Sequence, residues 1–384
     1  MVDFHMYRQI HSDSAAFKRV FTSIDNPHVK RMDQVVMEAD NPPPSPELYV
    51  FPDSINGYNL RSKRWGRFMH PSRTCGSFTN MYSPVDLEID YIRDVTWNKQ
   101  SFTHLVVDAE TKELVQALIT NQIAREQSTD IIESKGNGLI ILLHGGPGTG
   151  KTYTAESVAE MAEKPLYRVT CGDIGTKPEE VEKYLESVLH LSKSWGCVVL
   201  LDEADVFLEQ RTLTDLERNA LVSVFLRVLE YYEGILILTS NRVGTFDEAF
   251  KSRIQLSLHY ENLTRGQRAK IWKNFLNRLR EMDKSPPAKV TEPGTRNKTA
   301  AEPIGIDFDD IECYLSDLAE VEMNGRQIRN AITTARQLAK FKKELMNYSH
   351  LRHVIKVSSK FDSYLNTVRE GLSDDQIARD DGVR

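Results

Sequence analysis

One short stretch limits the possible folds of this 384-residue chain more than any other feature. From Leu139 to Thr152 it reads LIILLHGGPGTGKT, an apolar run followed by four glycines and a final Lys-Thr pair. Glycine permits tight turns that direct successive backbone N–H groups into one concavity, and such a concavity binds anions. Lys151 adds a positive charge, and Thr152 adds a hydroxyl that can bind Mg²⁺. The stretch therefore predicts a cradle for a phosphate chain.

The surroundings of this stretch support that interpretation. Its spacing, G-x-x-x-x-G-K-[ST], is the Walker A or P-loop pattern. A strand-like run precedes it at 139–143, and a helical pattern follows at 154–162, so that a helix N-terminus faces the same place. The residues expected to contact the nucleotide phosphates are Gly145, Gly146, Pro147, Gly148, Thr149, Gly150, Lys151, Thr152 and Tyr153.

A second stretch supplies acidic groups. The segment CVVLLDEADVFL, at 197–208, is a buried strand that ends in Asp202 and Glu203. Phosphoryl chemistry needs one carboxylate to help hold Mg²⁺ and another to activate water. We expect Asp202 and Thr152 to hold the metal and Glu203 to polarise the attacking water. The letters DEAD also suggest an RNA helicase, but the Ser-Ala-Thr motif and second sheet domain of those enzymes are not visible in the sequence.

A third stretch, 234–254, reads GILILTSNRVGTFDEAFKSRI and begins with a strand that ends in Thr239, Ser240 and Asn241. A polar residue at the tip of the strand beside the metal-binding strand can hold the lytic water or sense the γ-phosphate. We assign this role to Asn241. A role as a turn residue at the strand end is the simpler alternative.

Alternating elements predict the fold class. Strand-like segments at 166–170, 197–202, 235–239 and 255–258 alternate with helical stretches, which indicates an α/β domain with a parallel sheet covered on both faces. After residue 263 only helical segments follow, near 265–281, 307–320, 325–345 and 350–370.

These patterns divide the chain into four parts. An irregular N-terminal region, 1–100, has no assigned function and resembles a truncated domain. The nucleotide-binding core covers 101–263. A small all-α lid covers 264–370 and contains a disordered insertion at 283–305, and a tail follows at 371–384.

Composition limits the partners. The chain is 40% hydrophobic and 27% charged, and no apolar stretch approaches membrane-spanning length. We expect a soluble protein, cytoplasmic or nuclear, with no membrane partner. A net charge of -6 argues against nucleic acid. The basic segment 61–68, RSKRWGRF, could bind polyanions or act as a nuclear signal, but we interpret it as a solvated hairpin strand after Asn56-Gly57. The four cysteines have no metal-binding spacing, which predicts reduced thiols.

The strings GGPGTGKT, VVLLDEAD, LTSNR and FDEAFKSRI occur in the order and spacing of the AAA+ ATPases, and the resemblance covers roughly residues 97–366. Within that family the sequence most resembles a group of AAA ATPases found mainly in fungi. The resemblance implies an ATP hydrolase that uses ATP and Mg²⁺, forms a ring, expected to be a homo-hexamer, and remodels a protein partner. It identifies the class of ATPase but not the protein substrate.

The resemblance also implies roles for further residues. Arg253 aligns with the arginine finger that reaches the γ-phosphate bound by the neighbouring subunit. A surface arginine in a rim ion pair is the simpler alternative. The segment MNGRQIRNAI, 323–332, resembles the sensor 2 region, in which Arg329 fits the register best and Arg326 is the alternative. Ile131 and Ile132 would form part of the adenine pocket, although core packing explains them equally well.

Two features bear on how such a machine would act. Family members that thread polypeptides carry an aromatic residue in the pore loop, whereas the corresponding segment here, CGDIGTKPEE, has Ile174 and Gly175 but no aromatic side chain. This argues against processive threading.

The alternative function is a nucleotide-operated binding switch or adaptor with slow hydrolysis, and Glu203 and Arg253 count against it. The acidic charge balance argues against a DNA-acting clamp loader or helicase, although the basic segment 61–68 keeps that alternative open.

Overall fold

The computed structural model describes residues 54–61, 63–69, 87–88, 95–124, 138–175, 177–211, 215–241, 246–284 and 305–368. The chain divides into two units, 1–96 and 97–384. In the first unit, β1 (Ser54–Asn59) pairs antiparallel with β2 (Arg64–Met69), and β2 pairs parallel with β3 (Leu87–Glu88).

The β1–β2 pair confirms the predicted hairpin but not the position of its turn. Asn56 and Gly57 lie inside β1, and the turn includes Leu60, Arg61 and Lys63. The side chain of Asn59 accepts a hydrogen bond from the backbone N–H of Arg61 at 2.9 Å, which is the pattern of a turn initiated by asparagine. Arg61 therefore lies in the turn rather than in the strand. The sequence also predicts a short strand at 48–51, which lies outside the described residues.

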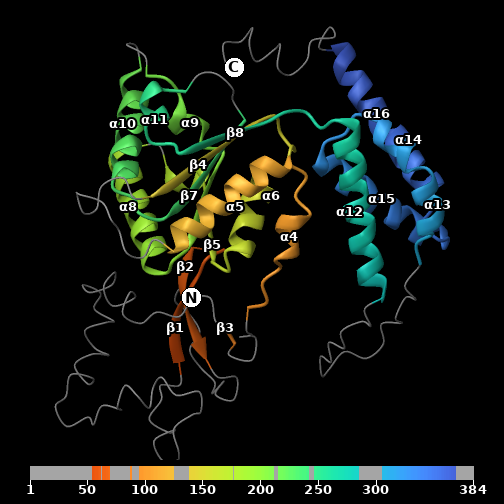
Figure 1. Cartoon of the computed structure of the whole chain (residues 1–384), viewed down its shortest axis with the longest axis horizontal. Helices are drawn as coiled ribbons and strands as arrows, with labels where there is room; N and C mark the ends of the chain where they lie inside the picture. The colour runs from red at the N-terminus through yellow and green to blue at the C-terminus, as the bar shows by residue number, and fades with distance from the viewer. Residues whose placement is uncertain are drawn as a thin grey trace, which may run out of the picture. The chain divides into compact units, whose positions relative to one another are not determined.

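The second unit contains the predicted parallel sheet, with strand order β5-β6-β7-β4-β8 (Figure 1). The five strands match the predicted segments to within about two residues. They are β4 (Leu139–Gly145), β5 (Leu166–Thr170), β6 (Val198–Asp202), β7 (Ile235–Ser240) and β8 (Leu256–Tyr260).

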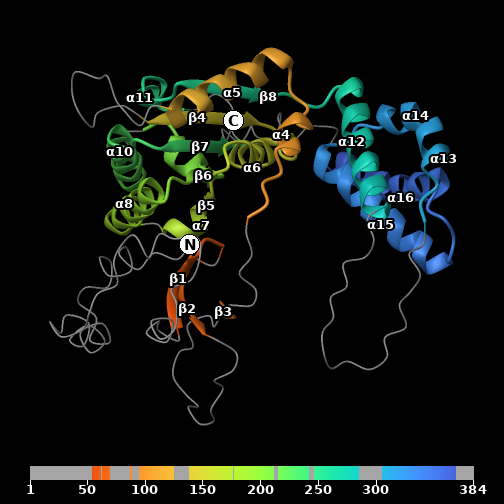
Figure 2. The ribbon, with the colours of Figure 1, turned by 60° about the horizontal axis from the view of Figure 1, so that its bottom comes forward.

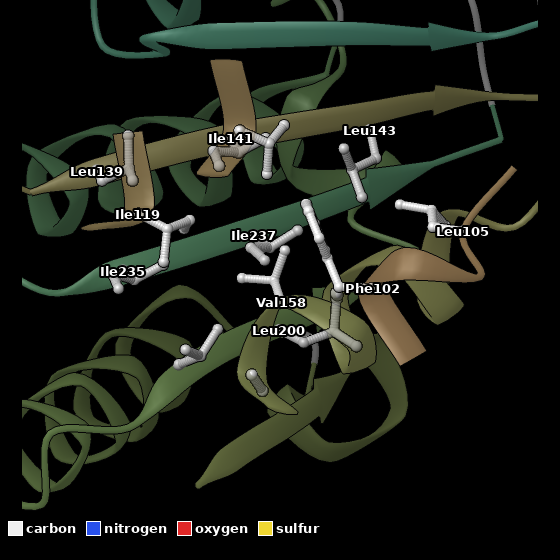
Figure 3. Packing of buried hydrophobic residues seen from close by; sticks show 14 residues of the cluster. Phe102, Leu105, Ile119, Leu139, Ile141, Leu143, Val158, Leu200, Ile235 and Ile237 are labelled. Atoms are coloured by element: carbon white, nitrogen blue, oxygen red, sulfur yellow. The ribbon is translucent and has the colours of Figure 1, made fainter. Parts of the chain in front are cut away.

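Helices cover both faces of this sheet, as Figures 1 and 2 show. Alternate residues of β4, β6 and β7 pack against α5 (Ala109–Ala124) and α6 (Lys151–Met161) in one hydrophobic cluster (Figure 3). The intervening residues of these strands are buried too, and α8 (Pro178–Ser194) and α10 (Leu216–Glu230) pack together, with α8 against β6. Strands buried on both faces explain the continuous apolar runs of the sequence. The shorter helices are α4 (Gln100–Thr103), α7 (Cys171–Ile174), α9 (Asp205–Leu208) and α11 (Glu248–Lys251).

The helical lid follows the sheet and has a hydrophobic cluster of its own around Trp272 and Ile328. The predicted helix at 307–320 is two helices, because Tyr314 ends one and precedes the next. Most of the predicted insertion lies outside the described residues. The lid helices are α12 (Arg265–Lys284), α13 (Phe308–Cys313), α14 (Leu315–Glu320), α15 (Gly325–Lys342) and α16 (Tyr348–Val368).

Two expectations from composition can be compared with the described residues. None of the helices in those ranges is long and apolar enough to cross a membrane. Cys171, Cys197 and Cys313 are free thiols, and Cys75 lies outside the described ranges.

Candidate active site

The glycine loop begins where β4 ends, at the C-terminal edge of the sheet. Gly145 has a φ of 142°, and a Cβ atom there would lie 2.1 Å from the carbonyl oxygen of Tyr260, so only glycine is accommodated. Gly150, with a φ of 110°, is the N-cap of α6. The loop thus leads directly into a helix N-terminus, whose unpaired N–H groups and dipole favour an anion.

Lys151 is the first residue of α6 and is only 7% exposed. Its ammonium group donates to the carbonyl oxygens of Gly145 at 2.8 Å and Gly146 at 2.7 Å, so the loop closes around its own lysine. Thr149 braces the same loop by donating to Gly146 at 2.9 Å. Because an ammonium group has three donors, phosphate oxygens can replace these carbonyls without leaving the charge unpaired.

Tyr153, also predicted at this site, is engaged with another helix. Its hydroxyl donates to the carbonyl oxygen of Ser101 in α4 at 3.2 Å, and its side chain is 41% exposed. Pro147 is exposed at the tip of the loop. The backbone of the loop and Lys151 are therefore the groups most directly arranged for phosphate.

Asp202 and Thr152 come together as the predicted metal ligands require. Asp202 ends β6 and is 7% exposed, and the Thr152 hydroxyl lies 3.2 Å from its Oδ1. Mg²⁺ prefers oxygen ligands and keeps several waters when protein carboxylates and phosphates bind it. An adjacent hydroxyl and carboxylate beside a phosphate cradle fit that preference.

Arg168 of β5 is a member of this site that the sequence did not reveal. Its Nη2 lies 2.5 Å from Oδ2 of Asp202, and half of its side chain is exposed. The two residues meet because β5 and β6 pair in parallel, with Thr170 opposite Asp202. This cation offsets the cost of keeping the Asp202 carboxylate charged while it is buried.

Glu203 has an unusual backbone. Its φ of 59° lies in the left-handed region, which side chains other than glycine rarely adopt. Its N–H donates to the Thr239 hydroxyl at 2.9 Å, and its carbonyl accepts from the Cys171 thiol at 2.7 Å. Burial raises the pKa of the Cys171 thiol to about 11, so the thiol keeps the proton that it donates. The Glu203 side chain is exposed at the sheet edge, where a base that activates water has to be.

Asn241 directly follows β7. Its backbone N–H donates to Oδ1 of Asp205 at 3.1 Å, and the Ser240 hydroxyl donates to the same oxygen. Asp205, which the sequence did not single out, therefore ties the tip of β7 to the turn that carries Glu203. This arrangement brings Asn241 and Glu203 to one edge of the sheet.

Arg253 lies at the other end of β4 from Lys151. It lines a cavity of about 280 Å³ together with Gly138, Ile140 and Glu230, and Gly138 immediately precedes β4. Lys151, in contrast, contacts Gly145, the last residue of the strand. The two side chains of one chain therefore lie at opposite ends of β4.

The lid touches the glycine loop. The Gly325 N–H donates to the carbonyl oxygen of Gly148 at 3.1 Å, and Asn324, the N-cap of α15, lies beside the same glycine. Asn324 was not predicted, although its capping box with Gln327 is a recognisable N-x-x-Q pattern.

The two sensor 2 candidates lie in the first two turns of α15. Arg326 and Arg329 are both exposed. Burial raises the pKa of Glu156 in α6, and the charges of Arg168 and Arg329 oppose that shift. Arg329 thus lies close enough to Glu156 of α6 for the two charges to interact. The proposed adenine contacts, Ile131 and Ile132, lie outside the described residues.

The predicted pore loop offers no apolar grip at Ile174. This side chain is 3% exposed and belongs to α7, whose N-terminus is fixed by a capping box between Thr170 and Asp173. The burial of Ile174, like the missing aromatic residue, argues against contact between this loop and an extended polypeptide.

Two family models match consecutive parts of the chain. Residues 141–262 match the family model described as "ATPase family associated with various cellular activities (AAA)", and residues 263–372 match "Fungal AAA+ ATPase lid domain". The chain resembles the crystal structure of the FIGL-1 AAA domain with a TM-score of 0.47 and 17% identity, over 72% of this chain and 92% of that chain.

Curated relatives match part of the chain. "ATPase family AAA domain-containing protein 3A homolog" of Drosophila melanogaster is 30% identical over 160 residues, which are 38% of this chain and 26% of that protein. "ATPase family AAA domain-containing protein 3C" of Homo sapiens is 28% identical over 151 residues, 37% of each. The chain thus spans about a third or less of these relatives' length.

A glycine loop at the end of a parallel strand, an acidic strand end beside it and a helical lid define a P-loop nucleotide-binding protein. With the two consecutive family matches, the chain belongs to the AAA+ ATPases, and its lid is of the fungal AAA+ type.

Proposed function

We propose that this chain binds and hydrolyses ATP in a Mg²⁺-dependent reaction, at sites shared between neighbouring copies in a ring. The observation that carries the proposal is the meeting of four groups at one sheet edge. The Lys151 ammonium lies inside the loop, and the Thr152 hydroxyl lies 3.2 Å from Oδ1 of Asp202. Glu203 is the residue directly after Asp202. A phosphate cradle with a carboxylate pair beside it suits phosphoryl transfer to water.

Each residue then has a distinct task. Lys151 and the loop N–H groups bind the phosphates of ATP, Glu203 accepts the proton of the attacking water, and Asn241 orients that water. Thr152 and Asp202 would hold Mg²⁺, which neutralises charge on the phosphates when it is bound. The domain bounds 101–263 for the core and 264–370 for the lid remain part of this proposal, as does a cytoplasmic or nuclear location.

The position of Arg253 supports the shared site. Lys151 and Arg253 lie at opposite ends of β4, so Arg253 cannot serve the phosphates bound by its own loop. The family resemblance implies that the ring is a homo-hexamer. In such a ring, one copy presents Arg253 to the nucleotide of the next. An arginine supplied in trans accelerates GTP hydrolysis by about 10³ to 10⁵.

The lid contact suggests how hydrolysis would act on a partner. Because Gly325 and Asn324 touch Gly148, a change in the phosphates held by the loop can alter the position of α15. We propose that this movement remodels a folded protein partner. The buried Ile174 is the reason to prefer remodelling over threading.

Steady-state ATP hydrolysis and MgADP binding test the proposal. Lys151→Ala should lose nucleotide binding, whereas Glu203→Gln should bind ATP and assemble into stable oligomers without turnover. Ser192→Ala, which removes a buried hydroxyl that donates to Val188 within α8, is a control and should behave as the wild type. Hydrolysis by Glu203→Gln at the wild-type rate would remove Glu203 from its assigned role.

The same assay separates the ATPase from the binding switch. A ring enzyme with a trans arginine gains activity per subunit steeply as the protein concentration rises. A switch with slow hydrolysis remains near zero turnover at every concentration.

A further inference from the structure

Thr239, the next-to-last residue of β7, contacts three consecutive residues of the acidic strand end. It is 1% exposed. Its hydroxyl donates to Oδ1 of Asp202 at 2.6 Å and accepts from the N–H of Glu203 at 2.9 Å. Its carbonyl oxygen accepts from the N–H of Ala204 at 2.8 Å. These directions are unambiguous, because a carboxylate can only accept and an amide N–H can only donate.

The sheet order places Thr239 between the two halves of the site. β7 lies between β6, which ends in Asp202, and β4, which leads into the glycine loop. Thr239 is paired with Leu143, two residues before the loop begins at Gly145. A threonine at this point can reach the acidic pair without leaving the strand.

The backbone of Glu203 needs such a partner. A non-glycine residue at a φ of 59° is disfavoured and persists where its surroundings hold it. Thr239 holds the N–H side of Glu203 and Cys171 holds its carbonyl. The left-handed turn is what separates the buried Asp202 carboxylate from the exposed Glu203 side chain.

We propose that Thr239 is a positioning residue for ATP hydrolysis. Its hydroxyl fixes the direction of Glu203 through the backbone and, at the same time, one oxygen of Asp202. The inference rests on the proposed function, since it assigns Glu203 as the base. It adds a residue that acts through both carboxylates and has no required contact with the nucleotide.

The proposal predicts loss of turnover with binding retained. Thr239→Val keeps the shape of the side chain but leaves the partly buried N–H of Glu203 without its acceptor. We expect kcat for MgATP to fall by about tenfold or more, since small misplacements of reacting groups have effects of this size. The dissociation constant for ADP measured without Mg²⁺ should remain within about twofold of the wild type, because Lys151 and the loop are unchanged.

A second pair of variants isolates the hydroxyl should the valine variant not fold. Thr239→Ala removes hydroxyl and methyl, and Thr239→Ser restores the hydroxyl alone. A positioning role predicts that Thr239→Ser recovers most of the wild-type kcat and that Thr239→Ala does not. A packing role predicts equal loss in both.

The outcomes separate this inference from the proposed function. If the wild type hydrolyses ATP and Glu203→Gln does not, but Thr239→Ser and Thr239→Ala share one kcat, the positioning role is wrong and the ATPase stands. Equal weakening of kcat and of ADP binding measured without Mg²⁺ in Thr239→Val also overturns the positioning role. A wild type no more active than Glu203→Gln overturns both proposals.

Discussion

Arg253 and Glu230 form an ion pair within one chain, in which Nη2 of Arg253 lies 3.2 Å from Oε2 of Glu230. Nη1 of the same arginine donates to the carbonyl oxygen of Ala249 at 2.9 Å, and 26% of the side chain is exposed. An arginine that acts on a neighbouring copy has to exchange these contacts for a phosphate. Because partly exposed pairs are weak, that exchange is accessible.

Glu230→Gln should ease this exchange, since it removes a charge and keeps an oxygen acceptor. We expect half-maximal ATPase activity at a lower protein concentration, with the same activity per subunit at saturation. Glu182→Gln, which removes the partner of Arg227, is the control and should follow the wild type. A Glu230→Gln concentration curve that coincides with the wild-type curve contradicts the prediction.

Gly148 tests the contact between lid and loop. It has a φ of 76°, and a Cβ atom there would lie 2.6 Å from Cγ of Asn324. Gly148→Ala should weaken MgADP binding measured by titration, on the order of tenfold, because the strained loop and the lid cannot keep their present positions. Gly266→Ala, whose Cβ would meet no atom within 4 Å and which lies in α12 outside the glycine loop, is the control.

A double variant shows which part of the Gly148 effect comes from the lid. Asn324→Ala removes the atoms in conflict, so it should partly restore MgADP binding when combined with Gly148→Ala. No restoration would mean that the loss comes from the backbone of the loop alone.

From the burial of the His144 ring we expect the folded state to lose stability on mild acidification. Its ring stacks on His259 with centroids 4.9 Å apart, and its Nδ1 is buried with no hydrogen-bond partner among the described residues. Burial lowers the pKa of His144 below its ordinary value of 6.5, and the charges of His259 and Lys151 act in the same direction. Because the unfolded chain binds the proton more readily, stability falls as the pH drops through about 6.5 and levels off below the folded pKa.

Urea unfolding at pH 7.5 and pH 5.5 measures this dependence. His144→Gln should reduce the difference in unfolding free energy between the two pH values, whereas His190→Gln, on the exposed side of α8, should leave it unchanged. An unaltered difference in His144→Gln would assign the pH dependence to other groups.

Asp247 should stabilise the segment that carries Arg253. It is 5% exposed, caps α11 through the N–H of Ala249, and accepts two hydrogen bonds from Arg211 at 2.6 and 3.1 Å. These hydrogen bonds lower the pKa of Asp247, and hydrogen bonding by the Arg211 side chain has the largest effect. The stabilisation is therefore complete above the ordinary carboxyl pKa of 3.8 and is lost as the pH falls through the lower folded value.

Asp247→Asn should lower the free energy of unfolding at pH 7 by about 1 to 3 kcal/mol, measured by urea denaturation. Glu248→Gln changes an exposed neighbour and should cost a few tenths of a kcal/mol at most. Equal effects of the two substitutions would contradict the structural role of Asp247.

Local sequence patterns predicted the sheet well. The predicted segment 166–170 coincides with β5, and the others differ only at their ends, because the apolar runs stop where the strands leave the core. The hairpin shows the limit of such patterns. Asn56-Gly57 is a strong turn signal, but pairing of β1 with β2 along its full length places it inside a strand.

Contacts between distant residues explain what the sequence missed at the candidate site. Arg168 and Asp202 are 34 positions apart, and only the register of β5 and β6 joins them. Thr239 reaches Asp202 and Glu203 because β7 lies beside β6. No short motif encodes either relationship, whereas the glycine loop is recognisable because its function depends on adjacent residues.

The most direct test of the shared site mixes two inactive variants. Lys151→Ala cannot bind the nucleotide, and Arg253→Ala cannot assist its neighbour, so each alone should have little ATPase activity. The account predicts that the mixture regains turnover, because some interfaces then combine an intact loop with an intact arginine. A mixture that assembles into common oligomers but stays as inactive as its components would contradict the account.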